Sequence, residues 1–107
     1  RDAAPLEAPP GLRANGMKKH IHVLYTGRVQ GVGFRFTAEE SARQLAVVGW
    51  VKNLRDGRVE LVAEADEKIL AQFLNEIKTG PMRNFIKDTE VTWGTATNEF
   101  EEFEIRY

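Results

Sequence analysis

Residues 47–64, VVGWVKNLRDGRVELVAE, decide the fold because they contain two strand-like segments joined by a turn. The pair Asp56-Gly57 predicts a tight hairpin, since glycine takes positive φ angles without steric cost. Residues 47–54 are rich in β-branched side chains, and the apolar residues of 58–64 alternate with charged ones. We therefore expect an antiparallel hairpin with one buried face and one solvated face.

A predicted helix flanks this hairpin on each side. Upstream, residues 37–46 begin with a possible capping box, Thr37-Ala38-Glu39-Glu40. Downstream, Asp66 can cap a second helix, and Gly80-Pro81 would end it. Both segments carry apolar residues at helical spacing: Ala38, Ala42 and Leu45 in the first, and Ile69, Leu70, Phe73, Leu74 and Ile77 in the second.

Three more segments are typical of strands, which are residues 20–29, residues 91–97 and a short final strand with alternating Phe103, Ile105 and Tyr107. The resulting order is βαββαβ plus a short C-terminal strand. The predicted fold class is α+β, a ferredoxin-like sandwich in which two helices cover one face of an antiparallel sheet. Such sheets carry enzymes, sensors and RNA binders, so the function must be argued from a site.

Composition narrows the classes of protein. The 107 residues suit one domain, and 15 basic against 16 acidic residues give no support for binding nucleic acid or an anionic membrane. The absence of cysteine excludes disulfides, thiolate nucleophiles and cysteine-ligated zinc. No apolar run reaches the length of a membrane span and no secretory signal pattern is present, so we expect a cytoplasmic protein.

The first segment of the chain differs from the rest. Residues 1–16, RDAAPLEAPPGLRANG, show neither helical nor strand periodicity. We predict that they are a disordered extension, either natural or left by cloning, and that the folded domain spans residues 17–107.

The candidate site is the loop GRVQGVGFR, residues 27–35, which lies between the first predicted strand and the first helix. In a strand, glycine loop and helix N-terminus, backbone N–H groups and the helix dipole converge on an anion. A cation near a helix N-terminus is unfavourable, so Arg35 also points to a bound anion. The loop lacks the Gly-Lys-Ser/Thr of a Walker A motif and the spacing of a Rossmann fingerprint. We expect an anion to be held by Arg35 and by the backbone N–H groups of Gln30, Gly31, Val32, Gly33, Phe34 and Arg35.

Two segments together resemble the acylphosphatase family. The first is the loop, matched by Gly27, Val29, Gln30, Gly31, Val32, Phe34 and Arg35, and the second is matched by Gly49, Trp50, Val51, Asn53, Gly57 and Val59. The resemblance covers about residues 18–107. One position departs from it, since Ala65 stands where the family commonly has glycine. We place Ala65 at a turn before the second helix and expect an altered turn there without loss of activity.

The resemblance implies an enzyme that hydrolyses acyl phosphates to a carboxylate and inorganic phosphate by direct attack of water, without metal, cofactor or covalent intermediate. It implies two catalytic side chains, Arg35 to bind the phosphoryl group and Asn53 to orient the water. A planar guanidinium matches two phosphate oxygens, and a carboxylate leaving group needs no general acid. We expect a monomer that acts on a small-molecule acyl phosphate, with neither nucleic acid nor membrane as a partner.

The alternative is a non-catalytic ferredoxin-like module that binds RNA or a small anionic ligand. Residues 30–36 look like an RNA-recognition motif, but that motif belongs on the third strand, and residues 58–64 contain no aromatic side chain. Simpler roles also exist for single residues. Arg35 could pair with Glu39, Asn53 could support the hairpin turn, and His20 and His22 could form a metal pair that lacks an evident third ligand.

Overall fold

A computed structural model describes residues 17–107, and the prediction for residues 1–16 falls outside the described residues. The described chain confirms the predicted order βαββαβ with a further strand. No helix among the described residues is long and apolar enough to cross a membrane. The elements are β2 (Lys18–Gly27), α1 (Phe34–Gln44), β3 (Val48–Asn53), β4 (Val59–Asp66), α2 (Glu67–Thr79), the 3₁₀ turn η2 (Arg83–Phe85), β5 (Ile86–Thr95) and β6 (Phe103–Arg106).

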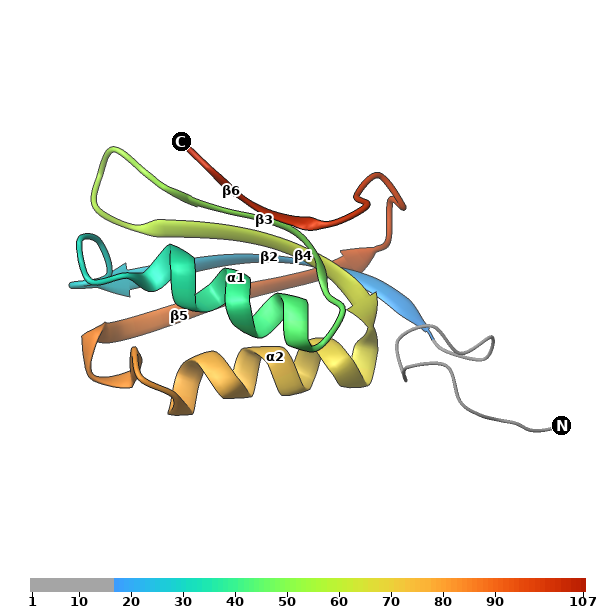
Figure 1. Cartoon of the computed structure of the whole chain (residues 1–107), viewed down its shortest axis with the longest axis horizontal. Coiled ribbons are helices and arrows are strands. Elements are labelled where there is room, and N and C mark those ends of the chain that lie inside the picture. The colour runs from blue at the N-terminus through green and yellow to red at the C-terminus, as the bar shows by residue number, and fades with distance from the viewer. Residues whose placement is uncertain (1–16) are drawn as a thin grey trace, which may run out of the picture.

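The five strands form one sheet in the order β5-β2-β4-β3-β6, and α1 and α2 lie side by side on one of its faces (Figure 1). The prediction of an antiparallel sheet holds for β2, β3, β4 and β5, but β6 pairs with β3 in parallel, so the sheet is mixed. Apolar alternation along a strand shows which face is buried, but it carries no information about strand direction. The sequence analysis therefore left the direction of the final strand open, and the structure shows it to be parallel to β3.

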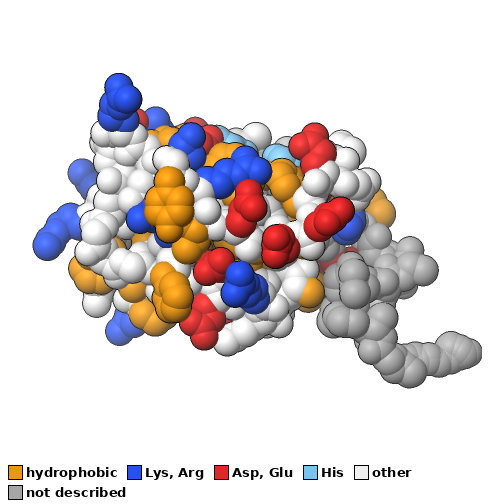
Figure 2. All heavy atoms as spheres, turned by 45° about the horizontal axis from the view of Figure 1, so that its top comes forward, with side chains coloured by type: hydrophobic (Ala, Val, Ile, Leu, Met, Phe, Trp, Pro, Cys, Tyr) orange, Lys and Arg blue, Asp and Glu red, His pale blue; other side chains and the backbone are white. Residues whose placement is uncertain are grey.

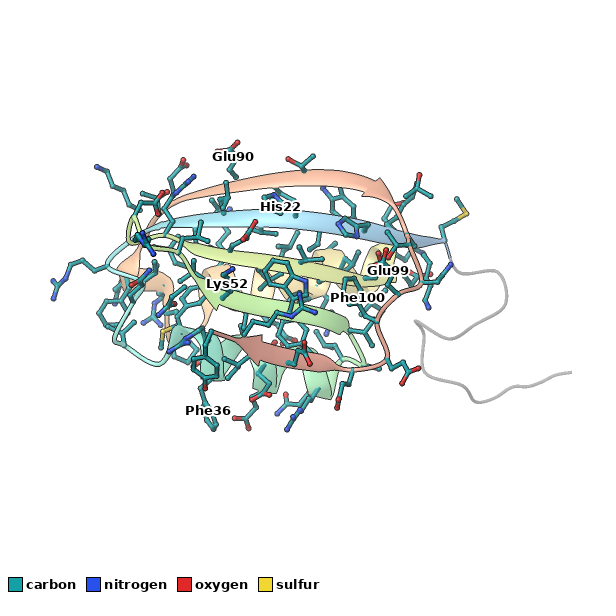
Figure 3. All side chains as sticks on the ribbon, turned by 90° about the horizontal axis from the view of Figure 1, so that it is seen from above. His22, Phe36, Lys52, Glu90, Glu99 and Phe100 are labelled. Atoms are coloured by element: carbon teal, nitrogen blue, oxygen red, sulfur yellow. The ribbon has the colours of Figure 1, made fainter. Side chains whose placement is uncertain are left out.

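The core lies between the sheet and the two helices. Alternate residues of β2, namely Ile21, Val23 and Tyr25, point into it and are buried. The intervening side chains lie on the open face of the sheet, where Figure 3 shows His22, Lys52 and Glu90. The remaining large buried side chains include Phe34, Leu61, Leu70, Phe73 and Phe103.

The first helix begins earlier than the sequence pattern predicts. It starts at Phe34, with Gly33 at the N-cap in the left-handed region (φ 84°), and the Thr37 N–H donates to the Gly33 carbonyl at 3.0 Å. The capping box at Thr37 is therefore wrong, because that residue already lies in the first turn. As a consequence, Arg35 lies in the first turn of the helix and not in the loop before it.

Two further boundaries differ from prediction. The strand expected from Val91 to Thr97 is β5, which begins at Ile86 and ends at Thr95. Its first half is charged and mostly exposed at the sheet edge, so it lacks the apolar alternation by which strands are recognised. Ala65 lies inside β4 and is buried, and Asp66 directly caps α2. The turn that we expected at Ala65 does not exist.

Candidate active site

The loop between β2 and α1 is anchored in the core by its apolar side chains, and its glycines take backbone conformations that other residues rarely adopt. Val29 is fully buried, and Val32 packs against the core from a half-buried position. Gly31 (φ 78°) and Gly33 (φ 84°) take left-handed conformations. Such alternation turns successive N–H groups toward one side of the chain, which creates a concave surface suited to an anion.

From residue 30 onward, the backbone N–H groups of this loop have no acceptor among the described residues. Among the described residues, residues 30–36 make no backbone hydrogen bond as donors, and no side chain caps the N-terminus of α1. The first turn of α1 also carries no acidic residue. A helix N-terminus with unpaired N–H groups attracts anions through these groups and through the helix dipole. We call the segment Gln30–Arg35 the cradle.

Asn53 reaches the cradle from the other side of the chain. It is the last residue of β3, on the same face as buried Val51, and this face points toward the helices. Its Oδ1 atom is buried and has no hydrogen-bond partner among the described residues. An unpaired buried amide oxygen costs roughly 1–3 kcal/mol, which a bound water or ligand can recover.

Arg35 and Asn53 line the same hollow, whose volume is about 240 Å³. The structure thus brings together the two side chains that the sequence singled out, although 18 positions separate them in the chain. Basic side chains are most numerous at the end of the molecule that holds the β2–α1 and β3–β4 loops (Figure 1, Figure 2). Acidic side chains lie mostly toward the middle. The complete lining consists of Val29, Gly31, Gly33, Phe34, Arg35, Phe36, Asn53, Ile105 and Tyr107.

Three of these lining residues were missed by reasoning from sequence, namely Phe36, Ile105 and Tyr107. The guanidinium of Arg35 lies over the Tyr107 ring, 4.9 Å from its centroid. The parallel register pairs Val51 with Ile105, so the chain after β6 arrives beside Asn53. The alternation of residues 103–107 marked a strand, but only the pairing of β6 with β3 brings that strand to the site.

The simpler role considered for Arg35 is not observed. Glu39 pairs with Arg43 at 3.1 Å, one turn further along α1, and Arg35 has no carboxylate partner among the described residues. Its guanidinium is therefore available to an anion on the side not covered by Tyr107.

Gln30 acts through its side chain, which we did not expect. Its Nε2 atom donates to the carbonyl oxygen of Leu54 at 2.7 Å and to that of Arg58 at 2.9 Å. Both carbonyls belong to the connection that follows Asn53. Gln30 does not line the hollow, and neither does Val32, but Gln30 ties the cradle to the hairpin that carries Asn53.

The two histidines do not meet at a common ligand. His20 Nδ1 lies 2.6 Å from Glu64, and His22 Nε2 lies 2.7 Å from Glu60, both on the open face of the sheet. Among residues 17–107, no group of three His, Asp or Glu side chains is placed to hold a metal ion. The His20/His22 pair is thus part of two separate polar contacts.

Comparison with known proteins agrees with this geometry. The acylphosphatase family model matches residues 21–105. An acylphosphatase from Oceanobacillus iheyensis is 40% identical over 90 residues, covering 83% of this chain and 99% of its own, and one from Methylococcus capsulatus is 44% identical over 87 residues, covering 81% and 95%. The crystal structure of acylphosphatase from Bacillus subtilis superposes with a TM-score of 0.78 at 37% identity, covering 83% of this chain and 99% of that one.

These matches extend over nearly the whole length of the relatives, and both site motifs fall inside the matched range. They support an enzyme and argue against the alternative of a non-catalytic binding module. The chain belongs to the acylphosphatase family and is an enzyme of that family.

Proposed function

We propose that this acylphosphatase hydrolyses acyl phosphates by direct attack of water on phosphorus, with Arg35 and the cradle holding the phosphoryl group and Asn53 orienting the water. The observation that carries the proposal is the shared hollow. Its volume of about 240 Å³ is lined by Arg35, by cradle residues whose N–H groups are unpaired, and by Asn53, whose buried Oδ1 has no partner among the described residues.

Each group matches one demand of phosphoryl transfer. The reaction asks mainly for positioning and for stabilisation of charge on the equatorial oxygens. Arg35 can hold two of these oxygens in a bidentate manner, while the N–H groups at the start of α1 bind the remaining one. The helix dipole adds favourable potential at the same place.

Asn53 is suited to orientation because its amide accepts a hydrogen bond through Oδ1 and donates through its NH₂ group. The water oxygen bonds to phosphorus as the bond from phosphorus to the acyl oxygen breaks, and the electron pair of that bond leaves with the carboxylate. The water proton passes to the phosphate product. Because the leaving group is a stable anion near neutral pH, no acidic side chain has to protonate it.

The acyl group of the substrate has an apolar surface to contact. Phe36, which is 64% exposed, and Tyr107, which is 93% exposed, both line the hollow. The substrate class that fits is a small acyl phosphate whose acyl part is apolar. Outside this hollow, Met17 and Trp93 are the only exposed large apolar side chains among the described residues, which supports a monomer. We also propose that the enzyme acts in the cytoplasm.

The test is turnover of benzoyl phosphate by four variants. We expect Arg35→Gln and Asn53→Ala each to lower kcat by roughly 10²-fold or more, the scale seen when one preorganised transition-state contact is removed. Arg43→Gln on the exposed face of α1 and Asn84→Ala in exposed η2 are the matched controls and keep full activity. Normal turnover by Asn53→Ala would refute the water-orienting role.

Inorganic phosphate gives an independent test, because it is both a product and a ligand for the cradle. It should inhibit competitively in the wild type, and its inhibition constant should rise in Arg35→Gln. Inhibition that is unchanged in this variant would place the phosphoryl group elsewhere.

A further inference from the structure

A second and larger hollow lies at a different place in the molecule. Its volume is about 700 Å³, within the range of sites that bind small organic molecules. It shares no lining residue with the active-site hollow. Its lining comes from Tyr25 of β2, from the C-terminal half of α2, from η2 and from β5 up to Val91, and the last three elements lie together at the left of Figure 1. We call this hollow the α2–β5 groove.

The floor of the groove is apolar and contains one unsatisfied donor. Tyr25 is only 1% exposed, and its hydroxyl is buried without a hydrogen-bond partner among the described residues. Burial raises the pKa of this hydroxyl above its usual value, so it stays protonated and can donate. Phenylalanine would fill nearly the same volume without leaving a donor unpaired. Half-buried Leu74, Ile86 and Val91 complete the apolar part of the lining.

The rim of the groove is positively charged. Lys78, Arg83 and Lys87 come from three different elements and are exposed, and none is in an ion pair among the described residues. Asp88 is the one acidic residue of the lining, so the groove carries a formal charge of +2 on a chain whose total is −1. The charge is therefore local and opposite in sign to that of the whole protein.

From this combination we infer that the α2–β5 groove is a second binding site, which takes a small organic anion with an apolar body and a carboxylate or phosphate head. The apolar body covers Leu74, Ile86 and Val91, the head lies among the three cations, and an acceptor atom of the ligand pairs with the Tyr25 hydroxyl. An apolar floor with a few convergent polar groups is the usual composition of a small-molecule site.

The experiment is an NMR titration of the ¹⁵N-labelled Arg35→Gln variant, which weakens anion binding at the active site and so isolates the groove. The probes are phenylphosphonate, benzoate, inorganic phosphate and benzyl alcohol. We expect phenylphosphonate and benzoate to cause saturable shifts of the amides of residues 74–78 and 86–91, and the tighter of the two identifies the preferred head. Phosphate lacks the apolar body and benzyl alcohol lacks the charge, so each should bind at least tenfold more weakly.

Variants separate the contributions of charge and hydroxyl. Lys78→Glu combined with Lys87→Glu should weaken binding at least tenfold, and Tyr25→Phe should weaken it severalfold while the fold persists. Lys18→Glu combined with Lys68→Glu makes the same change of charge at exposed positions outside the groove and should leave binding unchanged. The inference is overturned if no probe shifts the groove amides, if benzyl alcohol or phosphate binds as well as the two probes, or if both charge reversals act alike.

Discussion

The side-chain amide of Gln30 donates a 2.7 Å hydrogen bond to the carbonyl oxygen of Leu54, across 24 positions of sequence. Leu54 directly follows Asn53, so this bond ties the loop that carries Arg35 to the hairpin that carries Asn53. The same nitrogen donates a second hydrogen bond to the carbonyl oxygen of Arg58, on the other side of the turn. Gln30 therefore links the segments that carry the two proposed catalytic side chains, although it does not line their hollow.

Replacement of Gln30 by alanine should therefore impair catalysis without unfolding the protein. We expect kcat/KM for benzoyl phosphate to fall by roughly 10-fold to 10²-fold, because small displacements of reacting groups are costly. The free energy of unfolding should fall by about 1–2 kcal/mol, since two part-buried hydrogen bonds are lost while the carbonyls of Leu54 and Arg58 keep their backbone partners. Gln72→Ala, which removes an exposed contact on α2, is the control. Wild-type kinetics in Gln30→Ala would show that the cradle and the hairpin keep their positions without this contact.

Tyr107 should support Arg35 through its ring. Tyr107 is 93% exposed and stacks on the guanidinium, and an exposed cation–π contact is worth about 0.5–1 kcal/mol. We expect Tyr107→Leu to lower kcat/KM about 2-fold to 5-fold, and Tyr107→Phe to keep the wild-type value because the ring remains. Arg106→Gln removes a similar stack on Trp50, on the other face of the sheet, and should have no effect. Equal loss in the leucine and phenylalanine variants would point to the hydroxyl instead.

Gly49 should be far less tolerant of substitution than Gly57, although both have positive φ angles. A Cβ atom at Gly49 (φ 141°) would lie 2.0 Å from the carbonyl oxygen of Val62 in the neighbouring strand, whereas one at Gly57 (φ 101°) meets nothing within 4 Å. Strain at positive φ alone costs about 1–3 kcal/mol. In urea unfolding, we expect Gly57→Ala to lose free energy of unfolding within that range. The loss in Gly49→Ala should be well above it. Similar losses would mean that β4 moves aside easily.

Glu64 should make stability depend on acid pH. It is 1% exposed. Burial alone would raise its pKa, but hydrogen bonds from His20, Thr97 and Asn98 outweigh burial and lower the pKa to about 2 from an unperturbed 4.5. A carboxylate whose folded pKa is depressed stabilises the fold above its unfolded pKa, and this part is lost as pH falls from 4.5 to 2. The loss should amount to about 3 kcal/mol at most.

Urea unfolding followed by tryptophan fluorescence between pH 2 and pH 7 measures this effect. Glu64→Gln should be less stable than the wild type at pH 7 and should lose less stability between pH 4.5 and pH 2. Glu101→Gln, at an exposed position, should follow the wild-type curve. A wild-type curve that is flat across this interval would refute the lowered pKa.

Some of the site could be predicted from sequence because its signals are local. The glycines at 31 and 33, the arginine at 35 and the hairpin glycine at 57 act through backbone conformations and charges that neighbouring residues determine. The start of α1 was still wrong by three residues, because Gly33 takes the N-cap position without a capping side chain. A capping box predicts a helix start only when no earlier residue supplies one.

Other features are long-range and left no readable pattern. The charged first half of β5 pairs with β2 at the edge of the sheet. Side chains of an edge strand need not alternate between apolar and polar, so this segment carries no strand pattern. The contact of Gln30 with Leu54 and Arg58 likewise joins segments whose closeness follows from the pairing of β2, β4 and β3.

The sequence by itself determined the element order and, through glycine spacing and charge, singled out residues 27–35 with Arg35 as a candidate anion site. Asn53 followed from the resemblance of both motifs to the acylphosphatase family. Only the tertiary structure decided that β6 runs parallel to β3 and so brings Tyr107 to Arg35, and that α2, η2 and β5 enclose a cationic groove. Strand direction and the meeting of distant elements are set by how the apolar faces pack into one core. That packing is a property of the whole chain, so no local pattern contains it.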